Sequence, residues 1–217
     1  MRTFTQNSPV ITLYFVWNYF VIQRNYFRIK FRINMEIKIC KPNEIEEIFL
    51  SQIIDLIVQG GQIKSDRSGI RLLLSMADYI AFKHINNLVI STATLKNQYP
   101  SYKEKVFTLA NSKYSDRYNK ELGYIVTNPD FQNQGHCQHL LEAFFNLIKT
   151  HSIYATTRKP SMIHILNKLG FRQSGQVYNQ DLTLLVYDFL PFSVAHYHLW
   201  DFDNNANSYI SNGLEVV

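Results

Sequence analysis

A polar loop that contains a glycine lies in the middle of the chain, between a strand pattern and a helix pattern. Apolar and aromatic residues run from Leu122 to Val126, and Asn128-Pro129 ends this strand because proline cannot donate to a ladder. After Gly135, apolar residues recur at helical spacing: Cys137, Leu140, Leu141, Phe144 and Ile148. Free N–H groups and the dipole at such a helix start favour a phosphate or pyrophosphate. Many strand–loop–helix units with a glycine bind nothing, so this spacing alone leaves both interpretations open.

The full string of the loop is more specific than its spacing. From Gln132 to Cys137 it reads Q-N-Q-G-H-C, which resembles the acetyl-CoA loop of the GNAT N-acetyltransferase superfamily, usually written Q/R-x-x-G-x-G/A. Cys137 replaces the last small residue. Further along, Ile163 to Phe171 reads I-H-I-L-N-K-L-G-F and resembles the second signature of that superfamily. The two signatures occur in the expected order with a strand between them, and the resemblance covers roughly residues 35–188.

The resemblance implies an α/β (α+β) fold with a mixed, mostly antiparallel central sheet of about six to seven strands flanked by helices. It also implies acetyl-CoA as co-substrate, held between two strands that splay apart after the central strand. The pantetheine arm would pair with the backbone of Ile125, Val126 and Thr127. The pyrophosphate would bind the N–H groups of the loop residues Gln132, Asn133, Gln134, Gly135, His136 and Cys137.

The sequence departs from the family pattern at the general acid. The tyrosine that reprotonates the leaving thiolate in many members is replaced here by Leu166, and a common asparagine is replaced by Lys159. Glu121, at the start of the central strand, is our candidate base, with a surface carboxylate at a strand end as the alternative interpretation. Tyr124 and Tyr154 are further proton donors or, alternatively, residues of the core or cleft lining.

These features give three hypotheses for function. The first is an acetyl-CoA-dependent N-acetyltransferase that acts on a primary amine of an unidentified small molecule or peptide. The second, motivated by Leu166 and Lys159, is a catalytically idle acyl-CoA-binding or protein-interaction module. The third is a membrane-associated protein that uses residues 10–32. We expect the first.

Charge and cysteine content limit the partners and the compartment. Residues 1–34 contain five basic residues and no acidic residue, which accounts for the whole net charge of +5. The rest of the chain is therefore neutral, and we expect no nucleic-acid partner. Cys40 and Cys137 are far apart and form no paired motif, which favours a reducing cytoplasm. His196 and His198 lack a third ligand at fixed spacing, so we expect no metal site. Many resembling proteins dimerise, which leaves a homodimer open.

The first 34 residues contain an apolar segment that lies before the region resembling the family. The apolar run over residues 10–22 is too short for a membrane-spanning helix. It fits an interfacial anchor, an added strand or dimer contact, or sequence outside the native domain if translation starts at Met35. We favour the last and expect no membrane association, although a strand-like alternation crosses Met35 from Phe27 to Ile39. We therefore divide the chain into an extension (1–34), an acyltransferase domain (35–188) and a tail (189–217).

Periodicity and turn signals place the remaining elements. We expect a first helix capped by Asn43, with Ile48 in its apolar stripe, ending at Gly60-Gly61. A tyrosine-rich insertion over 97–120, helical near 102–110, either covers the substrate or packs on the surface. Strands are expected over 36–40, 78–84, 88–96, 153–157, 171–178 and 182–188, and further helices over 70–76 and 161–169.

Overall fold

The computed structural model describes residues 34–61 and 65–189 of the chain. The apolar run over residues 10–22 and the pair His196 and His198 lie outside these described residues, as do most of the predicted extension and tail. The expectations for those segments therefore stay predictions.

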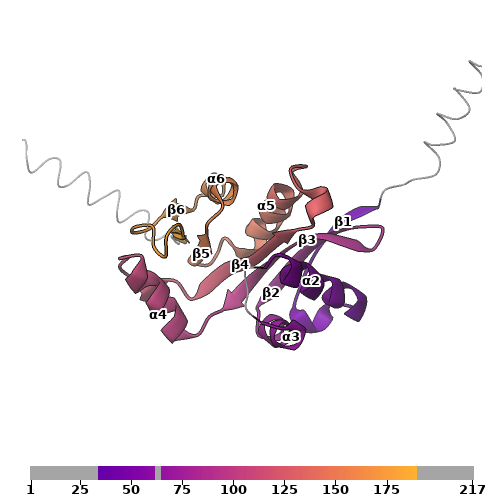
Figure 1. Ribbon diagram of the computed structural model, residues 1–217, viewed down its shortest axis with the longest axis horizontal. Coiled ribbons are helices and arrows are strands. Elements are labelled where there is room, and N and C mark those ends of the chain that lie inside the picture. The colour runs from indigo at the N-terminus through magenta and orange to yellow at the C-terminus, as the bar shows by residue number, and fades with distance from the viewer. Residues whose placement is uncertain (1–33, 62–64, 190–217) are drawn as a thin grey trace, which may run out of the picture. The chain divides into compact units, whose positions relative to one another are not determined.

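One seven-stranded sheet organises the described residues (Figure 1). Its spatial order is β1-β2-β3-β4-β5-β7-β6. The β2–β3, β3–β4, β5–β7 and β6–β7 pairs are antiparallel, and the β4–β5 pair is parallel. The predicted mixed, mostly antiparallel sheet is confirmed. The strands are β1 (Met35–Cys40), β2 (Tyr79–Ile85), β3 (Leu88–Asn97), β4 (Lys120–Thr127), β5 (Ile153–Thr157), β6 (Arg172–Gln173) and β7 (Thr183–Tyr187).

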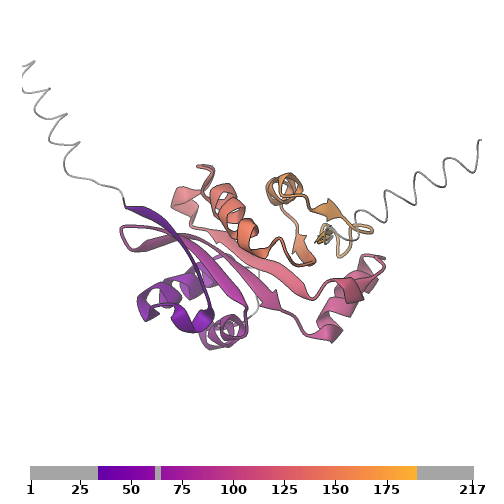
Figure 2. The same cartoon turned by 180° about the vertical axis from the view of Figure 1, so that it is seen from behind.

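Helices pack on both faces of this sheet. Figure 1 shows α2 and α3 side by side and α4 apart from them, and Figure 2 shows α5 next to α6. Alternation along β2 separates the two cores: Ala81 packs with α5, whereas Ile80 and Phe82 pack with α2 and α3. The α-helices are α2 (Glu47–Gln59), α3 (Arg67–Ser75), α4 (Pro100–Leu109), α5 (His136–Ile148) and α6 (Pro160–Lys168). Short 3-10 helices are η1 (Pro42–Glu44), η2 (Ser115–Arg117) and η3 (Pro129–Phe131).

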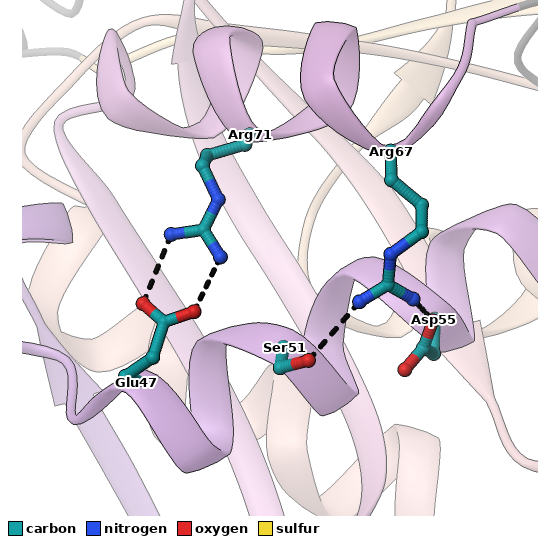
Figure 3. Close-up of polar contacts among 5 residues, drawn as sticks. All are labelled: Glu47, Ser51, Asp55, Arg67 and Arg71. Atoms are coloured by element: carbon teal, nitrogen blue, oxygen red, sulfur yellow. Dashed lines mark hydrogen bonds and ion pairs between the residues drawn. The ribbon is translucent and has the colours of Figure 1, made fainter.

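Polar contacts fix α3 against α2 (Figure 3). Both guanidinium nitrogens of Arg71 bond the carboxylate of Glu47. Arg67 donates to Ser51 Oγ at 3.0 Å and forms an ion pair with Asp55. These contacts join the exposed surfaces of the two helices, whose apolar residues Ile53, Ile57 and Ile70 share one core beneath them.

Three local predictions are wrong. Asn43 does not cap the first helix, because Pro42–Glu44 forms a 3-10 turn that Glu44 closes by accepting from the Lys41 N–H at 2.9 Å. The helix begins only at Glu47, and its buried stripe contains Phe49, Ile53 and Leu56 but not Ile48, which is 58 % exposed. The strand expected over residues 171–178 is reduced to Arg172–Gln173 and one isolated bridge.

Gly175 explains the break in that strand. Its φ is +73°, and a Cβ added there would lie 2.0 Å from the carbonyl oxygen of Ala110, at the end of α4. The same oxygen accepts from the N–H of Gln176 at 2.7 Å. The glycine thus lets the β6–β7 connection lie directly against the end of α4.

Replacing Gly175 by alanine is expected to destabilise the fold strongly. The added methyl group meets the Ala110 carbonyl, and the left-handed backbone costs an L-residue about 1–2 kcal/mol. Gly61→Ala is the matched control, because its φ is +65° and the nearest atom to an added Cβ is 3.9 Å away. Urea unfolding should show that Gly175→Ala costs about 2 kcal/mol more than Gly61→Ala. Equal losses of unfolding free energy in the two variants would mean that the backbone around Ala110 moves to accommodate the added methyl group.

Candidate functional site

Strands β4 and β5 pair only where they begin. The parallel ladder consists of Lys120 with Ile153 and Glu121 with Tyr154. Beyond Glu121, β4 continues to Thr127 with a ladder to β3 on one side, and β5 pairs with β7 on its far side. Within the described residues, the edges of β4 and β5 that face each other beyond this point have no ladder partner. The carbonyl oxygens of Val126 and Thr127 already accept from Ser91 Oγ and Gln132 Nε2, and the remaining N–H and C=O groups of this edge are available to an extended ligand.

A β-bulge shapes β4 at this free edge. Thr92 pairs with Val126 and Thr94 with Gly123, so the single residue between them on β3 faces two residues on β4. One of these two, Tyr124, has a φ of +48°, which is uncommon for a residue with a side chain. Bulges of this kind redirect side chains and backbone groups, often next to functional sites. Ile125, Val126 and Thr127, where the sequence predicted a cofactor contact, are half-buried along the bulged segment.

The loop after β4 forms a tight turn into α5. Asn128 begins it, because its N–H donates to Ile90 O at 2.8 Å and its side chain accepts from the N–H of Asp130. Pro129 then starts η3. Gly135 ends the turn with a φ of +77°, and no atom lies within 4 Å of the position that a Cβ would occupy. The approach to the helix start is therefore open.

The backbone N–H groups of this turn are free to bind. Across the described residues, the N–H groups of Asn133 to Gln138 have no hydrogen-bond partner, and the first helical bond runs from the His139 N–H to Gly135 O at 3.0 Å. The side chain of Gln132 folds back to Thr127 O and that of Gln134 to Asp130 O, each at 3.1 Å. Gln132 differs from the prediction in one respect, because its own N–H already bonds Pro129 O at 3.3 Å.

Basic side chains lie behind the turn. Lys83, on β2, is 3 % exposed, and its Nζ is 3.1 Å from Nδ1 of His139 on α5. Burial lowers the pKa of Lys83. Burial, and then the charges of Lys83 and His139, lower the pKa of His136. A lowered pKa means that the protonated, positively charged form of each side chain is disfavoured. A negatively charged ligand nearby would stabilise that form. Lys83 could not be recognised from the sequence, because it occupies a position like that of any other polar residue in an alternating strand.

Glu121 is buried at the point where β4 and β5 part. It is 3 % exposed, so the alternative interpretation of a surface carboxylate is wrong. Its Oε2 lies 3.0 Å from Nζ of Lys96, which faces it from β3 and is 8 % exposed. Gln98 Nε2 also donates to this oxygen, and the Tyr154 hydroxyl approaches it at 3.5 Å. The carboxylate is thus held by a buried ion pair and two neutral donors.

Gly123 makes room for the lysine of this pair. A Cβ at Gly123 would lie 2.6 Å from Cε and 2.8 Å from Nζ of Lys96. The ammonium also lies 4.3 Å from the ring centroid of Tyr124, a cation–π distance. Lys96 therefore extends along β4, past the last pair with β5. The sequence analysis missed it, although a glycine inside a strand can signal a close approach of this kind.

Four tyrosines are in electrostatic contact with the Glu121 carboxylate. Burial, and then the charge of Glu121, raise the pKa of Tyr102, Tyr124 and Tyr178 to about 12 in each case. The same two causes raise the pKa of Tyr154, which is fully buried. These hydroxyls stay protonated at neutral pH, so they are donors and not bases. Tyr102 comes from α4, which places part of the tyrosine-rich insertion near Glu121.

The position of the family's usual acid lies inside the core. Leu166 is fully buried, and Lys159 is the N-cap residue of α6. His164 is exposed on that helix. Cys137 is half-buried at the start of α5, where burial raises the pKa of its thiol, so it fills space and is not an activated nucleophile.

Two other kinds of site were searched for in the described part of the chain. No group of three or more His, Cys, Asp or Glu side chains converges there to hold a metal ion. None of the helices within residues 34–61 and 65–189 combines the length and apolar character that crossing a bilayer requires.

Comparison with known proteins rests on structure. No protein-family model and no curated protein sequence matches the chain. An acyl-CoA N-acyltransferase from Pseudomonas aeruginosa is similar with a TM-score of 0.52 and 12 % identity, over 71 % of this chain and 100 % of that one. YncA, a putative acetyltransferase from Salmonella typhimurium solved with acetyl-CoA, has a TM-score of 0.52 and 13 % identity, over 73 % and 95 %.

A third similar structure carries the family name. It is a GNAT-family acetyltransferase from Streptococcus agalactiae, with a TM-score of 0.50 and 19 % identity, over 73 % of this chain and 98 % of that one. Two features of this chain agree with the structural similarity. One is the sheet, in which the parallel β4–β5 ladder ends after two residue pairs, and the other is the turn into α5. The described residues of this chain have the fold of the GNAT acetyltransferases.

Proposed function

We propose that this protein is an acetyl-CoA-dependent N-acetyltransferase that acetylates a primary amine of a small molecule or peptide. The observation that supports it most is the row of free N–H groups from Asn133 to Gln138 at an open helix start. These groups and the dipole of α5 suit a diphosphate, and the free edge of β4 suits a pantetheine arm with its two amides. Lys83 and His136 add basic groups behind the diphosphate position.

The chain's own residues supply the remaining chemistry. The N–H groups of the bulge around Tyr124 are donors for a thioester carbonyl. Glu121, whose Oε2 lies 3.0 Å from Nζ of Lys96, accepts the proton of the acceptor amine. The protonated hydroxyls of Tyr124 and Tyr102 are donors for the departing thiolate, in place of a tyrosine at Leu166. Neither cysteine forms a disulfide, and we propose a cytoplasmic setting without a nucleic-acid or metal partner.

Titration calorimetry with acetyl-CoA tests the binding step. Binding at micromolar concentration is expected, with a weaker response to acetyl-pantetheine because it lacks the diphosphate. Thiol release is then measured with a panel of small primary amines and peptides with free amino termini. No heat of binding at high micromolar acetyl-CoA would refute the proposed function.

The idle module is the second candidate. Two observations favour it: Leu166 is buried in the core, and Glu121 is already paired with Lys96. It predicts that acetyl-CoA binds but that no amine in the panel accelerates thiol release. Turnover with any of these amines would exclude the idle module and support the transferase.

A further inference from the structure

Lys96 lies where an acceptor amine of the proposed reaction would be needed. It faces Glu121 across the β3–β4 ladder, and Glu121 makes the last pair of β4 with β5. From there the side chain runs along β4, so that Nζ lies above Gly123 and the ring of Tyr124. An amine, a carboxylate 3.0 Å from it and the free edge of β4 therefore meet at one point.

We propose that Lys96 is itself an acyl acceptor, so that the protein acetylates its own chain at this residue. This inference rests on the proposed function, because the acyl group comes from a bound acyl-CoA thioester. It adds a modification site inside the fold, and it makes Lys96 a competitor of any external amine for the Glu121 carboxylate.

The step balances with the groups present. Glu121 takes one proton from the Lys96 ammonium, and the lone pair of the free amine forms a bond to the thioester carbonyl carbon. The C–S bond breaks, and sulfur leaves as a thiolate. The second proton lost by the attacking nitrogen goes to this thiolate, which gives the thiol of CoA and a neutral amide at Lys96.

The other described lysines around the site lack this combination. Lys120, next to Glu121 in sequence, is paired with Asp78 and bonds Asn97 Oδ1 at 2.6 Å. Lys83 contacts His139 and has no carboxylate partner within the described residues. Exposed lysines such as Lys113 and Lys149 react with any acylating agent in solution, whereas Lys96 is 8 % exposed. Preferential acetylation of a buried lysine would thus point to bound acetyl-CoA.

Peptide mapping by mass spectrometry tests the proposal on the full chain incubated with acetyl-CoA. Acetylation of Lys96 is expected to exceed that of Lys113 and Lys149 by at least tenfold at equal times. Acetic anhydride, which needs no binding site, should reverse this order. An excess of CoA without an acyl group should suppress the reaction at Lys96 and leave the exposed lysines unaffected.

Variants of Glu121 test whether its carboxylate removes the proton of Lys96, or whether Lys96 reacts only because it lies close to the thioester. Glu121→Gln is expected to slow Lys96 acetylation at least tenfold, and Glu104→Gln, an exposed change on α4, is the matched control. Glu121→Asp keeps the charge and serves if Glu121→Gln fails to fold; it should retain part of the rate. If calorimetry shows acetyl-CoA binding while Lys96 is labelled no more than Lys113, the inference is wrong and the proposed function stands. If acetyl-CoA does not bind, both fall.

Discussion

Acetyl-CoA binding should fall by at least about 100-fold when Gly135 is replaced by valine. The φ of +77° at Gly135 is one that a β-branched residue adopts only with strain, and relief of that strain would turn the N–H groups of the turn away from one another. Hydrogen bonds to a charged group contribute about 1.5–3 kcal/mol each, so losing two of them exceeds the 2.7 kcal/mol that corresponds to 100-fold. Titration calorimetry on the wild type and the variant gives the ratio directly.

Gly61→Val is the control for this experiment. Gly61 has a φ of +65°, and the nearest atom to an added Cβ is 3.9 Å away, so valine imposes similar backbone strain outside the turn. Its acetyl-CoA affinity should stay within about threefold of the wild type, which is less than 1 kcal/mol. Should Gly135→Val bind as tightly as Gly61→Val, the turn before α5 is not the diphosphate site.

Breaking the buried pair of Lys96 and Glu121 should be the most destabilising charge change in the described residues. Removal of one partner leaves the other ion buried without a counter-charge, at a cost of about 3–5 kcal/mol. Lys96→Met and Glu121→Gln should each lower the free energy of unfolding by about this amount. The double variant buries no ion, so it should recover at least about 2 kcal/mol relative to the sum of the single changes. Urea unfolding of the four proteins completes the cycle.

An exposed pair calibrates this cycle. Arg158 and Asp181 form an ion pair at 2.7 Å, with side chains 46 % and 58 % exposed. Solvent screens such a pair, so replacing either residue by alanine should cost about 1 kcal/mol or less. If the Lys96 and Glu121 changes cost no more than this, water enters the site freely and the pair is not buried in solution.

Local signals predicted most of the elements around the site. Proline after β4, the glycine of the turn and the apolar repeat of α5 act on neighbouring residues, and the structure has the turn and helix where the sequence placed them. The strands expected over 78–84 and 88–96 are present as β2 and β3, and Asn86 and Asn87 between them adopt the positive φ of a tight turn. These features depend on backbone preferences within a few residues.

The residues that contact Glu121 could not be predicted from such local signals. Lys96 is 25 positions away in the sequence and meets Glu121 only because the β3–β4 register, shifted by the bulge at Tyr124, sets them opposite each other. Asn43 failed as a helix cap for a different, local reason, since Pro42 and Glu44 close a separate turn and the helix begins only at Glu47. Strand register is decided between distant segments, and a short turn competes with a helix start within the same few residues.

A binding turn built from peptide groups has a consequence for how such a protein diverges. Between Asn133 and Gln138 the groups that we propose as donors to a diphosphate are main-chain N–H groups, which every residue but proline supplies. Two positions of the turn have a left-handed backbone, Asn133 with a φ of +60° and Gly135 with a φ of +77°, so the amino acid type is restricted mainly at these two. If the turn binds a diphosphate as we propose, substitutions at its other positions can change the sequence motif and leave the N–H groups in place. That would account for a chain whose architecture is still matched at 12–19 % identity while its sequence matches no family model.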